Sequence, residues 1–322
     1  MQARYDSYAL VRTAIAAILL IAALSCNREH KRTIAVIPKA TTHLFFVSVH
    51  AGVAAAERDF GVNIIWNGPE QETDSSRQIE ILDAMIARHV DAIAISATDR
   101  DALVGSVRRA ISAGIPVTVF DSGIAIDDYV TFVATDNYDA GRTAAGKIAE
   151  LLHDKGKIAI IMQRPGGQST VQREQGFQDA IAKEHHGITI VAQQYGMGDP
   201  AKSRAAAEDI LTAHPDLDGI FASAEASSIG SIQALTARKL AGKIRLVGFD
   251  FSDTHRQALE QGILDATVVQ DPYRMGYEAV HSLVRKLNGE TPPKRMDLKA
   301  HLVLKADLTN PEVRKVLFPT AP

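Results

Sequence analysis

The chain has 322 residues, of which 46% are hydrophobic and 23% charged. This composition is ordinary for a soluble globular protein, and the length suits two lobes of roughly 130 residues each. A formal net charge of −3 gives no basic surplus and no acidic tail, so we predict no nucleic-acid partner.

The N-terminal segment predicts export. Arg4 and Arg12 precede an apolar run at 13–24 that is about a dozen residues long, too short for a membrane span of ~20 residues and suited to the hydrophobic region of a signal peptide. The run ends at Ser25-Cys26, the only cysteine. Small residues before a lone cysteine resemble a bacterial lipobox, although Ala23 stands where leucine is usual. We therefore expect a signal peptide at 1–26, lipidation of Cys26 and a linker at 27–32. The alternative, a conventional signal peptide with an incidental cysteine, also predicts export.

Strands and helices then alternate in two successive series. In the first, short apolar strands are expected at 33–38, 62–66, 91–95, 116–120 and 129–134, with helices at 44–60, 74–88 and 100–113. In the second, strands are expected at 157–162, 188–193, 219–222, 244–249 and 265–269, with helices at 137–153, 169–185, 200–213, 226–238 and 253–261. A helix at 273–288 and a last strand near 298–304 follow.

This order of elements predicts an α/β fold of two doubly wound parallel-sheet lobes. One open sheet with ten or more strands is uncommon, so the strand count favours two sheets. Right-handed crossovers place helices on both faces of each sheet, which explains the uninterrupted apolar strands. Ligands of such sheets bind beyond the carboxyl ends of the strands. Polar residues directly after a strand are therefore the best candidates for a site.

Polar and aromatic side chains follow several of these strands. They are His43, Phe45 and Phe46 after the first strand, Asp121 and Asp250 at two strand ends, Gln270 after another, and Arg173 early in a helix. Carboxylates accept hydrogen bonds from hydroxyl groups, arginine donates them and glutamine does both. Aromatic faces cover the C–H patches of a sugar ring. This combination predicts a site for a sugar-like polyol.

Each candidate also has a simpler interpretation. Asp121 and Asp250 could be ordinary caps at strand ends, Arg173 a solvated helix residue, and Gln270 only part of a hinge. Phe45 and Phe46 are adjacent and cannot share one helical face. We therefore expect one ring in the core and the other at the cleft.

From residue 33 to about 304 the chain resembles the type I periplasmic binding proteins, in particular the ribose-binding-like branch that serves sugar ABC importers. The segments that carry the resemblance are 45–48, Asp121, 134–137, Arg173 with Gly176-Phe177, 211–216, 247–250 and Gln270. The resemblance implies that Phe45, Phe46, Asp121, Arg173, Asp250 and Gln270 contact the sugar, with His43 in place of a loop asparagine.

The resemblance also implies a hinge of three crossings, near 134–136, 270 and 299. The expected lobes are then 33–135 plus 271–298 and 136–270 plus 299–315, with a tail at 316–322. Besides His43, three positions depart from the family pattern: Ser122 replaces an arginine, Ala224 an asparagine and Gly198 an aromatic residue. These departures predict a roomier pocket and a larger or less polar sugar than ribose.

Catalytic and cofactor motifs are missing from the sequence. There is no G-x-S-x-G elbow, the glycines at 166–167 lack the lysine of a phosphate-binding loop, and no spacing indicates a metal site. We therefore predict a binding protein without enzymatic activity or cofactor, monomeric and lipid-anchored in the periplasm or at the cell surface, that delivers its ligand to an ABC transporter permease. A sensor that serves a membrane receptor is the alternative. A repressor-type effector domain would need an N-terminal helix-turn-helix in place of the export signal.

Overall fold

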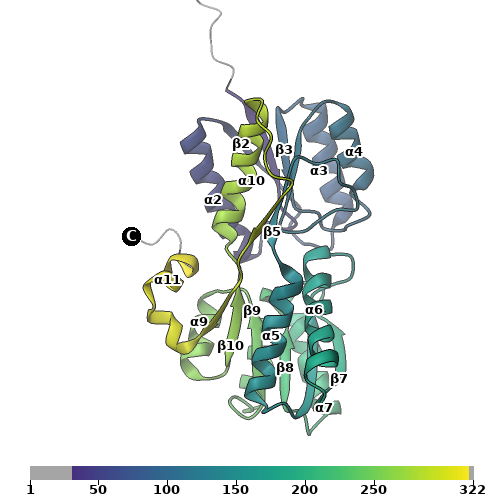
Figure 1. Ribbon diagram of the computed structural model, residues 1–322. Coiled ribbons are helices and arrows are strands. Elements are labelled where there is room, and N and C mark those ends of the chain that lie inside the picture. Colours follow the sequence, from purple (N-terminus) through teal and green to yellow (C-terminus); the bar gives the residue numbers. More distant parts are fainter. Residues whose placement is uncertain (1–30, 319–322) are drawn as a thin grey trace, which may run out of the picture. The chain divides into compact units, whose positions relative to one another are not determined.

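The computed structural model describes residues 31–318, so the predicted signal peptide, the proposed lipidation site at Cys26 and most of the predicted linker lie outside the described residues. The described chain forms two six-stranded sheets (Figure 1). The first has the order β11-β5-β4-β3-β1-β2, formed by β1 Thr33–Ile37, β2 Asn63–Trp66, β3 Ala92–Ile95, β4 Val117–Phe120, β5 Phe132–Thr135 and β11 Arg295–Leu298. The second has the order β12-β10-β9-β8-β6-β7, formed by β6 Gly156–Met162, β7 Ile188–Tyr195, β8 Gly219–Ala222, β9 Arg245–Phe249, β10 Ala266–Val269 and β12 His301–Leu304.

Helices cover both faces of each sheet. On the first sheet, α2 Leu44–Phe60 and α10 Pro272–Leu287 pack on one face, and α3 Ser75–Ala87 and α4 Val104–Ser112 on the other. On the second sheet, α5 Asn137–Leu151 and α6 Gln168–Glu184 pack on one face, and α7 Pro200–Ala213, α8 Glu225–Ala237 and α9 Asp253–Gln261 on the other. We call each sheet with its helices a lobe. A strand buried on both faces has no polar side to present, so β3, β4 and β8 consist almost entirely of apolar residues.

The chain passes between the lobes three times. The connections run from β5 to α5, from β10 to α10 and from β11 to β12, and Figure 1 shows the last of them as a long extended segment. The strand expected near 298–304 is therefore two strands, one in each sheet. β11 is parallel to β5, whereas β12 is antiparallel to β10, so the second sheet is not wholly parallel.

The C-terminal segment belongs to the second lobe. After a 3₁₀ turn at Lys305–Thr309, helix α11 spans Pro311–Leu317. Leu317 is buried in the core of this lobe, so packing continues into the segment 316–322 that the sequence predicted as a tail.

Glycines allow two helix pairs to cross closely. In the first lobe, a Cβ on Gly52 would lie 1.9 Å from the carbonyl oxygen of Tyr273, and one on Gly276 2.2 Å from that of Val49. In the second lobe, a Cβ on Gly176 of α6 would lie 2.0 Å from the carbonyl oxygen of Tyr138 in α5. These contacts fix α6, which carries Arg173, against α5.

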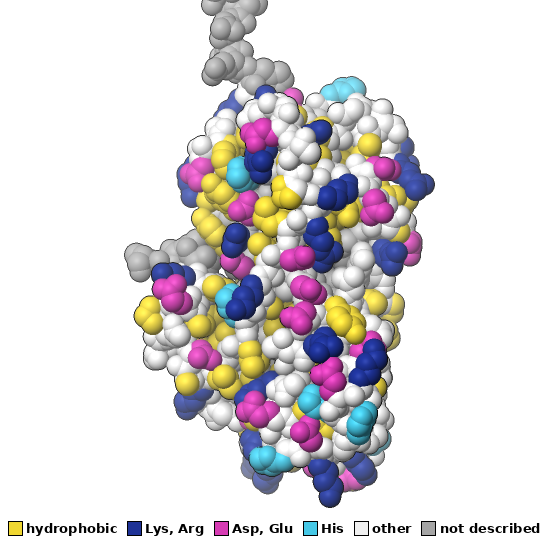
Figure 2. All heavy atoms as spheres, viewed as in Figure 1, with side chains coloured by type: hydrophobic (Ala, Val, Ile, Leu, Met, Phe, Trp, Pro, Cys, Tyr) yellow, Lys and Arg dark blue, Asp and Glu magenta, His cyan; other side chains and the backbone are white. Residues whose placement is uncertain are grey.

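Charged side chains of both signs are interspersed over the face in Figure 2, in keeping with the small net charge. Within residues 31–318, no helix combines the length and the apolar character that crossing a bilayer requires.

Candidate ligand-binding site

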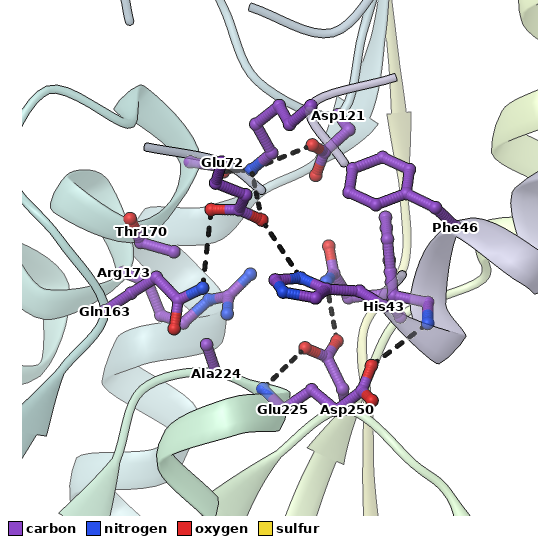
Figure 3. A pocket seen from close by; sticks show the side chains of 14 residues that line it. His43, Phe46, Glu72, Asp121, Gln163, Thr170, Arg173, Ala224, Glu225 and Asp250 are labelled. Atoms are coloured by element: carbon purple, nitrogen blue, oxygen red, sulfur yellow. Dashed lines mark hydrogen bonds and ion pairs between the residues drawn. The ribbon is translucent and has the colours of Figure 1, made fainter. Parts of the chain in front are cut away.

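A pocket of about 30 Å³ lies between the carboxyl ends of the strands of both lobes (Figure 3). Fourteen residues line it, and they include all seven that the sequence predicted: His43, Phe45, Phe46, Asp121, Arg173, Asp250 and Gln270. These residues come from segments more than 220 positions apart in the chain, and the fold brings them to one cavity.

The two strand-end aspartates share an unusual backbone conformation. Asp121 follows β4 with φ 57°, and Asp250 follows β9 with φ 67°. Left-handed backbone is costly for most residues, but the short polar side chain of aspartate tolerates it. The Asp121 carboxylate accepts the Ser96 hydroxyl at 2.7 Å. That of Asp250 accepts the Gln270 amide at 2.8 Å, and burial raises the pKa of Asp250 although Arg173 opposes this effect.

Arg173 is a buried residue, which excludes its interpretation as a solvated helix side chain. It is 2% exposed, and its guanidinium lies 3.3 Å from the centre of the Phe249 ring. The guanidinium donates to the carbonyl oxygen of Ser223 and, at 2.9 Å, to Asn137 Oδ1. Burial lowers the Arg173 pKa, against the charge of Asp250. These contacts hold the group rigidly at the pocket wall.

Phe45 and Phe46 both line the pocket and both pack in the core of the first lobe. Their rings meet edge to face with centroids 5.1 Å apart. The expectation that one ring faces the core and the other the cleft is therefore wrong. Helix α2 begins at Leu44, so its first turn presents its end to the pocket, and adjacent residues reach the cavity together.

Lys39 is a pocket residue that sequence reasoning missed. It follows β1, is 5% exposed, and its ammonium group lies 3.0 Å from Asp121 and 3.9 Å from Glu72. Burial alone would lower the Lys39 pKa, but the charges of the two carboxylates outweigh burial and raise it. The strand-end rule could have identified this residue, since Lys39 is the first polar side chain after the strand.

Glu72 and His43 form a second charged contact. His43 Nδ1 lies 3.4 Å from Glu72 Oε1, and Gln163 of the second lobe donates to Glu72 Oε2 at 3.3 Å. Burial would raise the pKa of Glu72, but Lys39 and His43 hold it far below its usual range. The same contact raises the His43 pKa against the effect of burial. Glu72 lies in the loop between β2 and α3, beyond the residues that directly follow the strand, and it is not among the residues predicted from the sequence.

Glu225 joins the lobes directly. Its carboxylate accepts the backbone N–H groups of Leu44 at 3.4 Å and Phe45 at 3.0 Å, at the start of helix α2. Burial and the charge of Asp250 raise the Glu225 pKa. A carboxylate at this place is favourable because the N-terminus of a helix carries a partial positive charge.

The expectation of a roomier pocket than in the family stays a prediction, and the cavity of this structure is small. Ala224 lines it and Ser122 is buried beside it, but the long side chains of Lys39, Glu72 and Glu225 occupy the space. About 30 Å³ suffices for water and not for a sugar ring. The third departure, Gly198, lines a neighbouring cavity instead.

A family model described as "Periplasmic binding protein domain" matches residues 34–291. The chain belongs to this family of periplasmic binding proteins. It is 30% identical over 297 residues to the D-ribose/D-allose-binding protein of Pseudomonas aeruginosa, covering 90% of this chain and 92% of that protein. It is 28% identical over 295 residues to the ribose import binding protein RbsB of Escherichia coli, covering 91% and 97%.

Solved structures of solute-binding proteins resemble this one closely. A carbohydrate transporter solute-binding protein from Agrobacterium radiobacter, in complex with D-arabinose, has a TM-score of 0.87 at 34% identity, covering 90% of this chain and 99% of that chain. An ABC transporter solute-binding protein from Agrobacterium vitis, with bound D-fucose, has a TM-score of 0.86 at 34% identity, covering 89% and 100%. The predicted family and fold class are confirmed.

Among residues 31–318, no group of three or more His, Cys, Asp or Glu side chains is arranged to hold a metal ion. The carboxylates of the pocket are instead engaged by Lys39, Gln270 and backbone N–H groups.

Proposed function

We propose that this periplasmic binding protein captures a sugar in the cleft between its lobes and delivers it to an ABC importer. The observation that carries the proposal is the single pocket into which both lobes send carboxylates, a guanidinium, an amide and aromatic rings. Such groups match the hydroxyl groups and C–H faces of a sugar. The ribose-binding relatives and the arabinose- and fucose-bound neighbours support the same class of ligand.

Unsatisfied atoms in the pocket support direct ligand contacts. The buried Oε1 atoms of Gln270 and Gln163 and the Nε atom of Arg173 hydrogen-bond to nothing within the described residues. A buried polar atom without a partner costs about 1–3 kcal/mol. We propose that sugar hydroxyls satisfy these atoms, and that His43, Phe45, Phe46, Asp121 and Asp250 complete the contact surface.

Ligand entry requires the lobes to separate. Lys39 Nζ donates to Ser169 Oγ at 3.2 Å, and Arg100 N donates to the carbonyl oxygen of Gly166 at 3.0 Å, both between lobes. The pocket between them is too small for a sugar ring. Opening about the three connections would admit the ligand, and closure would stabilise the bound form through contacts from both sides.

We further propose the finer assignments that the sequence suggests. The lobes comprise 33–135 plus 271–298 and 136–270 plus 299–315, and residues 316–318 pack on the second lobe. The protein acts as a monomer without catalysis, in the periplasm or at the cell surface, anchored by lipid on Cys26. The lipobox-like Ser25-Cys26 and the family's role in binding support this view.

Isothermal titration calorimetry against pentoses, hexoses, polyols and nucleosides tests the proposal. We expect saturable one-site binding of at least one sugar, abolished or weakened in an Asp250→Asn variant. Binding of a nucleoside alone, or of no sugar or glycoside at all, would overturn it.

A further inference from the structure

A second cavity lies next to the ligand pocket. Its volume is about 260 Å³, compared with about 30 Å³ for the pocket itself. The first lobe contributes Thr42 and Gln71 to it, and the second lobe contributes Met197, Gly198 and Lys202. Unlike the pocket, this chamber has room for a ring-sized group without any movement of the protein.

Three residues border both the pocket and the chamber. His43, Glu72 and Glu225 line both cavities, and Figure 3 shows the His43 ring between Glu72 and the carboxylates of the second lobe. His43 and Glu72 come from the first lobe and Glu225 from the second, so these side chains move apart when the lobes open. A ligand seated in the pocket could then extend into the chamber as the lobes close.

Gly198 leaves free space in the chamber beside His43. Its φ is 71°, and a Cβ there would lie 3.2 Å from Gln163 Nε2 and 3.8 Å from His43 Cε1. Any larger side chain would fill the space next to His43. Met197, immediately before, also has left-handed backbone, with φ 55°.

The chamber lining combines polar groups with apolar surface. Gln71 and Lys202 offer hydrogen-bond donors, while Met197 and Pro200 offer apolar contacts. The carboxyl groups of Glu72, Asp199 and Glu225 outnumber the two basic residues, Lys202 and His43, so the lining disfavours an anion. A neutral, hydroxyl-bearing unit with C–H faces fits these groups.

We propose that the ligand is a glycoside or disaccharide whose first sugar occupies the pocket and whose second, neutral unit occupies the chamber. This inference rests on the proposed sugar-binding function. It accounts for the departure at Gly198, which adds space to the chamber and not to the pocket.

Calorimetry with the full chain tests the inference, with monosaccharides compared against their methyl glycosides and neutral disaccharides. We expect a disaccharide or glycoside to bind at least about tenfold more tightly than its parent monosaccharide. Lys202→Ala should remove part of this preference while leaving monosaccharide affinity unchanged, whereas Lys243→Ala, an exposed lysine outside the chamber, should change neither.

A variant that fills the chamber provides a second test of the inference. Gly198→Asn should abolish the preference for the larger ligand, because asparagine tolerates left-handed backbone and its side chain would occupy the space. Gly262→Asn is the matched control, since Gly262 has φ 70° and none of the chain described here lies within 4 Å of its Cβ position. Equal affinity for monosaccharides and their glycosides would overturn the inference and leave the proposed function intact. Absence of any sugar or glycoside binding would overturn both.

Discussion

The carboxylate of Glu225 in the second lobe accepts the backbone N–H of Phe45 in the first lobe at 3.0 Å. His43, at the N-cap of α2, makes no side-chain capping hydrogen bond, so the opposite lobe supplies the acceptor that this helix start needs. The contact exists only when the lobes are together. It therefore stabilises the closed form whether or not a ligand is present.

Loss of this contact should shift the protein toward the open form. A partly buried carboxylate at a helix N-terminus contributes up to about 2 kcal/mol, or roughly 30-fold in an equilibrium constant. In Glu225→Ala we expect a larger radius of gyration by small-angle X-ray scattering of the ligand-free protein, and faster ligand release by stopped flow. Glu80→Ala, which removes an exposed carboxylate of α3, serves as the control. An unchanged radius and release rate would show that Glu225 does not hold the lobes together.

Asp250→Asn should weaken sugar binding by tenfold or more. Asparagine retains the left-handed backbone at φ 67° but removes the charge, and charge-assisted hydrogen bonds contribute about 1.5–3 kcal/mol each. Arg173→Ala should weaken binding similarly, because it leaves buried acceptors unpaired. The matched control is Asp154→Asn, which has φ 55° and lies outside the pocket. If calorimetry gives the same affinity for both pocket variants and wild type, the pocket is not the sugar site.

Glu174 should make the folded state less stable as the pH rises. Burial raises its pKa from 4.5 to about 7, although Gln163, Ser223 and Arg173 stabilise the charged form. The unfolded chain loses this proton first, so the folded state binds more protons between pH 4.5 and 7. Stability therefore falls across that window, by about 3 kcal/mol for a change of this size.

Glu174→Gln should remove this loss. In urea unfolding, the free energy of unfolding of the variant relative to wild type should be higher at pH 7.5 than at pH 5. The comparison with wild type cancels the contributions of other titrating groups. Glu184→Gln, at the exposed end of the same helix, should show no such gain. If the difference in unfolding free energy between variant and wild type is the same at both pH values, Glu174 does not cause the loss of stability.

Gly176→Ala should destabilise the second lobe and weaken ligand binding together. Its Cβ would lie 2.0 Å from the carbonyl oxygen of Tyr138, so α6 must move and Arg173 with it. Overpacking of this kind costs about 1–3 kcal/mol or more. Gly146→Ala on α5 is the control, because its Cβ position has no neighbour within 4 Å in the described chain, and it should stabilise by about 0.4–1 kcal/mol. Thermal unfolding and calorimetry provide the measurements, and equal melting temperatures for the two variants would refute the close-packing argument.

Much of the site could be predicted from the sequence because strand ends are local features. Asp121, Asp250 and Gln270 each follow a short apolar run, and parallel strands of one lobe send their carboxyl ends to the same edge. Lys39 obeys the same rule and could have been included. Glu72 was harder to identify, since it lies well past the end of β2 and its ion pairs with Lys39 and His43 form only in the folded protein.

The alternation of apolar strands and amphipathic helices by itself determined the two α/β lobes, since each strand must be covered on both faces. Residue types at strand ends determined that a polar, sugar-like ligand is expected. Only the tertiary structure decided how much space that ligand has and where. Cavity volume depends on side chains that meet from distant segments, so the pocket is filled by Lys39, Glu72 and Glu225 while the free volume lies beside Gly198. Cavity volumes arise from packing between distant segments and leave no periodic signal in the sequence.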